Sequence, residues 1–162
     1  MKKLNRKGFT LIELLAIIVI LAIIMVVTIP TVLGSLGDAK IKTFNASANS
    51  SAEWIEKQYS IASIGDTMAG TVANAFKTIC GEKGATCTAT QTLSLDDANT
   101  DADNIAFINA SGIKASNYTE AQVTITDGRA CVILTANTTS GDFSNLKDNS
   151  GNAVTEAKSS GC

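Results

Sequence analysis

An uninterrupted apolar segment near the start of the chain constrains its fold more than any other feature. Fourteen consecutive apolar residues run from Leu14 to Val27. Flanking apolar side chains extend the segment to about 25 residues, and these are Phe9, Leu11, Ile12, Ile29, Val32 and Leu33. Because ~20 apolar residues suffice to cross a bilayer as a helix, the segment predicts a membrane-spanning helix. The rest of the chain is rich in Ser, Thr, Asn, Ala and Gly, so only a modest core remains for a globular part.

Charge is distributed unevenly around the apolar segment. Four of the thirteen basic residues precede it, and these are Lys2, Lys3, Arg6 and Lys7. The chain after Gly8 therefore carries nine basic and fifteen acidic side chains, a net charge of −6. Lys and Arg are enriched on the cytoplasmic side of membrane helices, so residues after about Ser35 are predicted to lie outside. An acidic exported part without a basic patch argues against nucleic acid as a main partner.

A glutamate inside the apolar segment argues against a secretory signal peptide. The run is longer than the roughly 7–15-residue core of a signal peptide, and no small-x-small cleavage site follows it. At membrane depth Glu13 would cost ~2.5–3.5 kcal/mol, so we expect it to have a function and a partner. Its helical neighbours three and four residues away include no cation, and they are Phe9, Thr10, Ala16 and Ile17. We therefore expect its partner to come from elsewhere.

The residues around Glu13 resemble the N-terminus of type IV pilins and pseudopilins. The resemblance is carried by Lys7-Gly8-Phe9-Thr10-Leu11-Ile12-Glu13-Leu14-Leu15, the apolar run and Pro30. In that family a prepilin peptidase cuts after the glycine and the new N-terminal residue is methylated. The glutamate five residues into the mature chain is understood to pair with the N-terminal amine of a neighbouring subunit. The resemblance thus implies that Gly8 is the cleavage residue, Phe9 the methylated terminus and Glu13 the pairing carboxylate.

The same resemblance implies partners and a location. The partners are identical or related pilin subunits, the prepilin peptidase/methyltransferase, the membrane and the pilus-assembly machinery. The chain would cross the cytoplasmic membrane once, with its C-terminus outside, and then enter an extracellular filament. Cleavage creates an ammonium at Phe9, and a paired buried carboxylate is far less unfavourable than an unpaired one. We hypothesise that the Glu13–Phe9 pairing sets the register of assembly; the alternative is an uncleaved signal anchor with a chance glutamate.

The apolar helix is expected to continue beyond Pro30 to about Ser60. Pro30 predicts a kink or locally freed hydrogen bonds, and in the resembling family a proline near this place accompanies local melting of the helix. Apolar residues then recur at spacings of three and four, on one helix face, at Ile41, Phe44, Ala48, Ala52, Ile55 and Tyr59. Trp54 lies near this stripe and is expected to pack in the core or at its edge.

Later segments predict smaller elements. A second helix is expected over residues 66–79 and a short strand over residues 105–108. Asp127-Gly128 between the runs 121–125 and 129–135 predicts a β-hairpin. Residues 137–161 are rich in Asn, Ser, Gly, Thr and Asp and are expected to form a loop.

This order of elements predicts an α+β fold, in which the C-terminal half of one long helix packs on a small antiparallel sheet. We expect three parts: a leader peptide over residues 1–8, a transmembrane and filament-core helix over residues 9–34, and an exported globular pilin domain over residues 35–162. The last part includes the C-terminal half of the long helix.

The four cysteines allow three disulfide pairings. An even cysteine count in an exported segment indicates disulfides, and we favour Cys80–Cys87 and Cys131–Cys162. The first pair closes a short loop, whereas the second ties the C-terminus to the hairpin. The resembling family often has a disulfide near its C-terminus, which supports the second pair.

Other chemistry is weakly indicated. Asp97, Asn99, Asp101 and Asp103 alternate oxygen ligands as a calcium loop does, but the turn glycine and a final glutamate are missing, so a solvated acidic loop is the favoured interpretation. The chain has no histidine and no Cys-x-x-Cys, and hence no usual general base or zinc ligand set. We expect no catalytic residue, metal or cofactor, and no enzyme activity.

The leading functional hypothesis is a structural subunit of a type IV pilus that serves adhesion, surface motility or aggregation. A pseudopilin of a type II secretion or DNA-uptake system has the same N-terminus, so the motif does not separate the two. A membrane-anchored binding protein that never polymerises is a third hypothesis, which an intact Met1 would support.

Overall fold

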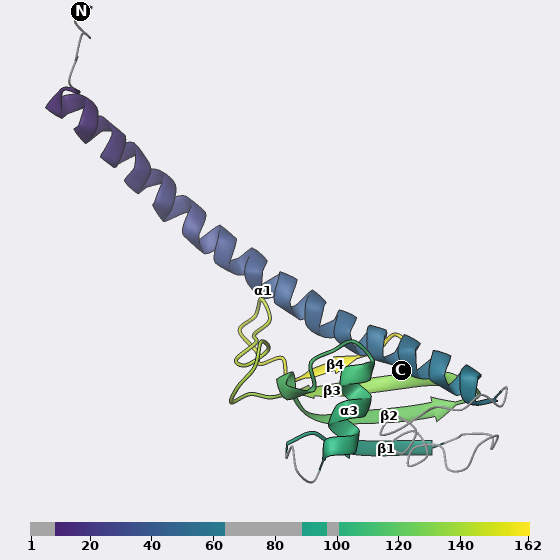
Figure 1. The fold of residues 1–162 in the computed structure, drawn as a ribbon. Coiled ribbons are helices and arrows are strands. Elements are labelled where there is room, and N and C mark those ends of the chain that lie inside the picture. The colour runs from purple at the N-terminus through teal and green to yellow at the C-terminus, as the bar shows by residue number, and fades with distance from the viewer. Residues whose placement is uncertain (1–8, 64–88, 97–100) are drawn as a thin grey trace, which may run out of the picture. The chain divides into compact units, whose positions relative to one another are not determined.

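The computed structural model describes residues 9–63, 89–96 and 101–162. These residues divide into two compact units, with the boundary between Leu36 and Gly37. The elements in chain order are helix α1 (Leu11–Ser63), strand β1 (Ala89–Ser94), helix α3 (Ala102–Ala110), the 3₁₀ helix η1 (Ala115–Asn117), and strands β2 (Tyr118–Thr126), β3 (Arg129–Ala136) and β4 (Glu156–Lys158) (Figure 1). The helix expected over residues 66–79 and the expected pair Cys80–Cys87 lie outside the described residues.

Helix α1 runs without interruption through Pro30. Proline has no backbone N–H to donate, so one hydrogen bond of the helix is missing at this position. Two threonine hydroxyls bind carbonyls of the preceding turn on either side of it. The Thr28 hydroxyl donates to the Ile24 carbonyl at 3.0 Å, and the Thr31 hydroxyl donates to the Val27 carbonyl at 3.2 Å. Each hydroxyl thus has a hydrogen-bond acceptor within its own helix, although the surrounding side chains are apolar.

The four strands form one antiparallel sheet in the order β1-β2-β3-β4 (Figure 1). The predicted hairpin is confirmed: β2 and β3 pair from Tyr118–Ala136 to Thr126–Arg129. Both turn residues have positive φ, 51° at Asp127 and 80° at Gly128, as a two-residue type I′ turn requires. A side chain at Gly128 would also lie 3.3 Å from the ring of Tyr59, so glycine meets both demands.

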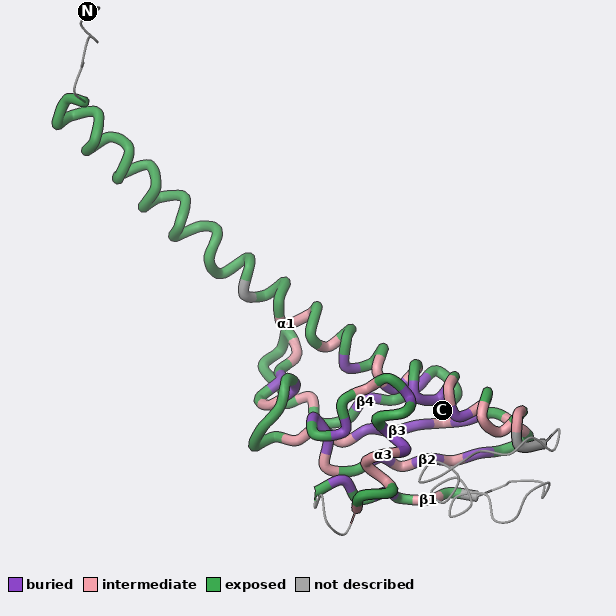
Figure 2. The backbone as a smooth tube through the Cα atoms, viewed as in Figure 1, coloured by how far each residue is buried: buried purple, intermediate pink, exposed green. Residues whose placement is uncertain are grey.

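The core lies between α1 and one face of the sheet. Alternate residues of β2 and β3 are buried, whereas their neighbours are partly exposed, so one face of the sheet is covered. The predicted stripe of α1 is confirmed as its partner: Phe44, Ala48, Ala52 and Ile55 are buried, and Ile41 and Tyr59 pack at the margin (Figure 2). Trp54 is partly buried and meets Phe107 of α3 edge-on, with ring centroids 5.2 Å apart. It therefore packs at the edge of the core, as expected.

Two expectations about local structure are wrong. Residues 105–108 belong to helix α3 and not to a strand. Four apolar residues in a row fit either element, and the helix brings Phe107 and Ile108 into the core. Residues 137–161 are not loop throughout, because β4 pairs with β3 at Leu134↔Ala157. Only Ala157 of β4 is buried, so its three residues carry no apolar pattern to reveal a strand.

The phenol of Tyr118 is the titratable group most affected by the core. Its side chain is 1% exposed and stacks on Phe44. Burial raises the pKa of Tyr118 above its ordinary value of 10.0, nearby Asp142 raises it further, and a hydrogen bond with Ser47 lowers it in part.

Tyr118 should therefore make the folded chain sensitive to alkaline pH. The neutral phenol is favoured in the folded state, so stability is full below the unfolded pKa of 10.0 and is lost as pH rises through the folded pKa. Ultraviolet titration of phenolate should show a step above pH 10.0 that Tyr118→Phe removes. A wild-type curve identical in shape to that of the variant would contradict this expectation.

Candidate processing and assembly site

The first turn of α1 holds Glu13 through Thr10. The Thr10 backbone N–H and the Thr10 hydroxyl each donate to Glu13 Oε2 at 2.8 Å. In return the Glu13 backbone N–H donates to the Thr10 hydroxyl at 3.3 Å. This reciprocal arrangement is a capping box, in which the residue before the helix and the residue three positions later satisfy each other's backbone donors.

Thr10 is a residue that the sequence reasoning missed. A cation is the partner expected for a carboxylate in an apolar helix, and Thr10 carries no charge. The Thr-x-x-Glu spacing before an apolar run is itself a known helix-start signal and could have identified it. The carboxylate is therefore already partnered within its own chain. Among the described residues no hydrogen bond occupies Glu13 Oε1, which leaves that atom able to accept from an ammonium.

The other predicted site residues do not form one site with Glu13. Phe9 is 82% exposed and precedes the capping box directly, whereas Gly8 lies outside the described residues. Pro30 lies about 25 Å farther along α1 than Glu13, at 1.5 Å per residue. The structure thus brings Phe9 and Glu13 to one end of the helix and leaves Pro30 as a separate feature.

The apolar residues of this part of α1 are exposed. They include Leu14, Ile18, Ile23 and Val26, each at least half exposed (Figure 2). By length and composition α1 is apolar enough to cross a membrane, with a mean hydropathy of 3.2 in its most apolar stretch. Such a surface is unfavourable in water, so lipid or other apolar helices must cover it.

The C-terminal residues are fastened to β3 and α1. The predicted disulfide Cys131–Cys162 is present, with the two Cα atoms 4.6 Å apart. Ser159 adds two bonds to Val132: its backbone N–H donates to the Val132 carbonyl, and its hydroxyl accepts from the Val132 N–H, both at 2.9 Å. The Ser160 N–H donates to Asn49 Oδ1 of α1 at 2.7 Å. We call residues 159–162 the C-terminal clasp.

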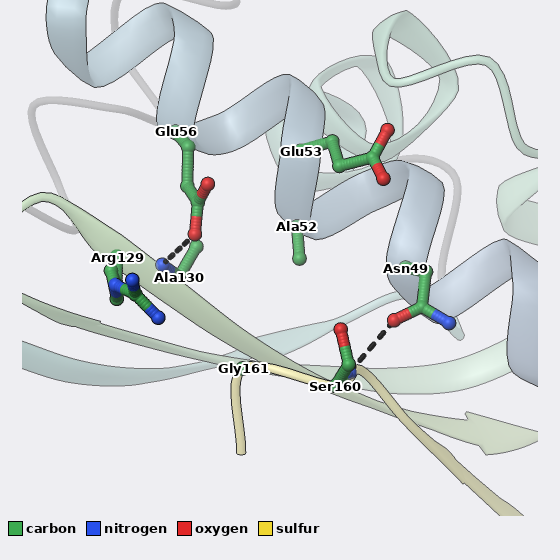
Figure 3. Close-up of a pocket in the computed structure, with 8 residues that line it drawn as sticks. All are labelled: Asn49, Ala52, Glu53, Glu56, Arg129, Ala130, Ser160 and Gly161. Atoms are coloured by element: carbon green, nitrogen blue, oxygen red, sulfur yellow. Dashed lines mark hydrogen bonds between the residues drawn. The ribbon is translucent and has the colours of Figure 1, made fainter.

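Gly161 lets the clasp lie close to β3. A Cβ at this position would stand 2.6 Å from the Ala130 carbonyl oxygen, closer than real contacts allow. The clasp and α1 also enclose a recess of about 360 Å³. It is lined by Asn49, Ala52, Glu53 and Glu56 from α1, Arg129 and Ala130 from β3, and Ser160 and Gly161 from the clasp (Figure 3). Glu56 Oε1 accepts from the Ala130 N–H at 2.9 Å, whereas Glu53 is exposed.

The candidate calcium loop is only partly described. Asp97 and Asn99 lie outside the described residues. Asp101 Oδ2 accepts from the Ser94 hydroxyl at 2.8 Å, so this carboxylate helps join α3 to β1. In the parts of the chain that the structure covers, no three acidic or cysteine side chains gather as a metal site would require. The solvated-loop interpretation stays a prediction.

Comparison with known proteins gives one informative match. Residues 3–29 match the family model of the prokaryotic N-terminal methylation motif, whereas no curated protein and no solved structure matches the chain. The chain thus combines an N-terminal methylation motif with a long helix whose C-terminal part packs on an antiparallel sheet. A segment of this kind is typical of type IV pilins and pseudopilins.

The C-terminal clasp should contribute measurably to stability. The Cys131–Cys162 bond closes a loop with a sequence separation of 31. Chain-entropy estimates credit a loop of this length with about 3–4 kcal/mol. Cys131→Ser/Cys162→Ser should lower the free energy of unfolding by about that amount in urea titrations of the detergent-solubilised chain. Reductant should lower the midpoint of the wild type by more than that of the double variant, which keeps only the favoured Cys80–Cys87 pair. Equal midpoints of the two chains without reductant would contradict this expectation.

Proposed function

We propose that this chain is a structural subunit of a type IV pilus, cleaved after Gly8 and methylated at Phe9. The N-terminal methylation motif over residues 3–29 is the observation that carries the proposal. Such a motif implies processing by a prepilin peptidase and assembly with pilin-like subunits. In this proposal residues 1–8 are the leader, residues 9–34 the membrane and filament-core helix, and residues 35–162 the exported domain.

The capping box suggests how Glu13 is carried through the membrane. Before assembly, two donors from Thr10 lower the cost of the carboxylate in an apolar environment. Cleavage then exposes an ammonium at Phe9, which can bind Glu13 Oε1 of a neighbouring subunit. A hydrogen bond between an ammonium and a carboxylate is stronger than the bonds from the neutral donors of Thr10. Pairing therefore favours the assembled register over a free subunit.

The apolar surface of α1 supports the same path. Exposed apolar side chains that first contact lipid can later contact the equivalent helices of other subunits, so the surface is covered in both states. The Thr28 and Thr31 hydroxyls donate to the Ile24 and Val27 carbonyls, so these two carbonyls would keep a partner if the helix loosened there in the filament. The chain is thus proposed to cross the cytoplasmic membrane once and then to leave it as part of an extracellular filament.

A pilus is favoured over a secretion or DNA-uptake pseudopilus by two features. Glu13 suits a subunit that joins the body of a fibre, because some subunits that only initiate a fibre lack this carboxylate. The disulfide and the clasp suit a domain displayed in an oxidising exterior. The pseudopilin is the second candidate, and the non-polymerising anchor is the third.

Surface filaments provide the direct test. Filaments sheared from cells that express the chain should contain it, and mass spectrometry should find a mature N-terminus at Phe9 carrying one methyl group. An intact Met1 on a chain that stays in the membrane fraction would instead support the anchor. Filaments present only when a secretion system is active would favour the pseudopilin.

Removing the charge of Glu13 should reduce assembly without preventing processing. Glu13→Gln keeps the size of the side chain and an oxygen that accepts from Thr10, but it cannot pair with an ammonium as a carboxylate does. We expect sheared filaments to fall at least tenfold, since a buried charged hydrogen bond is worth roughly 1.5–3 kcal/mol. Cleavage after Gly8 should continue.

Asp103→Asn is the matched control, because this carboxylate is exposed on α3 and lies outside α1. Its filament yield should equal that of the wild type. If Glu13→Gln assembled as well as Asp103→Asn, charge pairing would have no part in assembly.

A further inference from the structure

The outer face of α1 in the second unit is exposed and formed by small side chains. Ala39, Thr43, Ala46 and Ser50 follow one another at spacings of four, three and four, and each is exposed. At about 100° per residue, they lie on the side of the helix opposite the core stripe. The Thr43 hydroxyl donates to the Ala39 carbonyl at 3.0 Å, so it needs no outside partner. A face of this kind lets another helix approach closely, but does not by itself say which one.

Lysines and glutamates lie beside this face, and two of them on opposite flanks, Lys40 and Glu53, indicate its partner. Lys40 and Glu53 are exposed, and neither makes an ion pair with another described residue; the ion pair found among these residues joins Lys158 to Glu156. At about 100° per residue, their 13-residue separation places them roughly 140° apart, on opposite flanks of the small face. Charges on opposite flanks are complementary when two copies of a helix pack side by side in parallel.

Glu53 also lines the recess beside the clasp. The recess contains two carboxylates, Glu53 and Glu56, and one guanidinium, Arg129, so its lining has a net charge of −1 (Figure 3). Glu56 uses one oxygen to accept from Ala130, while Glu53 accepts no hydrogen bond within the described residues. One further cation would neutralise the recess, and an ammonium on a flexible stem can reach into about 360 Å³ of open space.

We propose that this face is an interface with a second copy of the chain, in which Lys40 of one subunit enters the Glu53–Glu56 recess of the next. The inference rests on the proposed filament function, which gives all subunits the same orientation because each enters from the membrane. Lys40 and Glu53 meet when parallel helices are shifted by 13 residues, or ~20 Å along the axis. Such a contact uses two different patches and repeats without closing, as a fibre requires.

Zero-length cross-linking tests the contact directly. A carbodiimide joins an ammonium to a carboxylate only where they touch, and Lys40 and Glu53 of one rigid helix are ~20 Å apart. A Lys40–Glu53 cross-link in sheared filaments must therefore join two subunits. Filaments grown from mixed ¹⁴N and ¹⁵N chains should give mixed-label cross-linked peptides. Filaments that form normally but never join Lys40 to Glu53 or Glu56 would overturn the inference and leave the pilus function standing.

Charge exchange provides the second arm. Lys40→Glu and Glu53→Lys should each reduce filament yield at least about tenfold, because each places like charges at the contact. The double variant Lys40→Glu/Glu53→Lys should restore yield to within about threefold of the wild type. Lys114→Glu is the control, since this exposed lysine precedes η1 and lies outside α1.

The outcomes separate the two proposals. Lys40→Glu and Glu53→Lys filaments as abundant as those of Lys114→Glu would overturn the interface alone. Loss in both single variants without recovery in the double variant would also count against direct pairing. A wild-type chain that never enters filaments would overturn the proposed function, and the interface with it.

Discussion

A carboxylate placed in an otherwise apolar helix is the constraint on which the first unit depends. Glu13 cannot remain bare in lipid, and the structure shows that its nearest donors come from Thr10 of the same chain. The capping box begins α1 and binds the carboxylate through one of its two oxygens. The same few atoms therefore cap the helix and provide hydrogen bonds to the charge. The charge stays incompletely compensated, because two neutral donors stabilise a carboxylate less than an ammonium does. That remaining imbalance is what makes a new N-terminus at Phe9 consequential in the proposed assembly.

The second unit depends on the same helix in a different way. Here α1 contributes a buried stripe to the core. The C-terminal clasp is joined to β3 by a disulfide and to α1 by a hydrogen bond. Asn49 and Glu56 bind backbone N–H groups of Ser160 and Ala130, so polar side chains at the margin of the core connect three segments that are distant in sequence. A buried hydrogen bond between Ser51 and Ser111, 2.9 Å long, likewise joins α1 to the end of α3. These bonds satisfy groups that would otherwise be costly to bury, and they fix where α1 lies against its own sheet.

The outer face of α1 carries side chains that do not pack in the core. The face itself is formed by small side chains, and Lys40 and Glu53 on its flanks make no ion pair with another described residue. A solvated helix face usually carries mixed long polar side chains, whereas small side chains form this one from Ala39 to Ser50. Ser160 and Gly161 of the clasp line part of the recess beside Glu53. The Cys131–Cys162 bond, which ties the clasp to β3, therefore bears on the shape of the proposed contact surface.

The sequence alone determined the features with a strong local pattern. These are the apolar run, the residues around the Gly8–Phe9 junction, the stripe from Ile41 to Tyr59, the Asp127-Gly128 hairpin and the pairing of Cys131 with Cys162. Periodicity, turn chemistry and family resemblance act over short distances, so they can be seen without a fold. Tertiary structure decided the rest. Residues 105–108 are helical because Phe107 and Ile108 then pack in the core. Strand β4 forms because the edge of β3 is available for pairing. The recess at Glu53 was also beyond sequence, because it joins residues 49–56 to residues 129–130 and 160–161, and only the fold makes them neighbours.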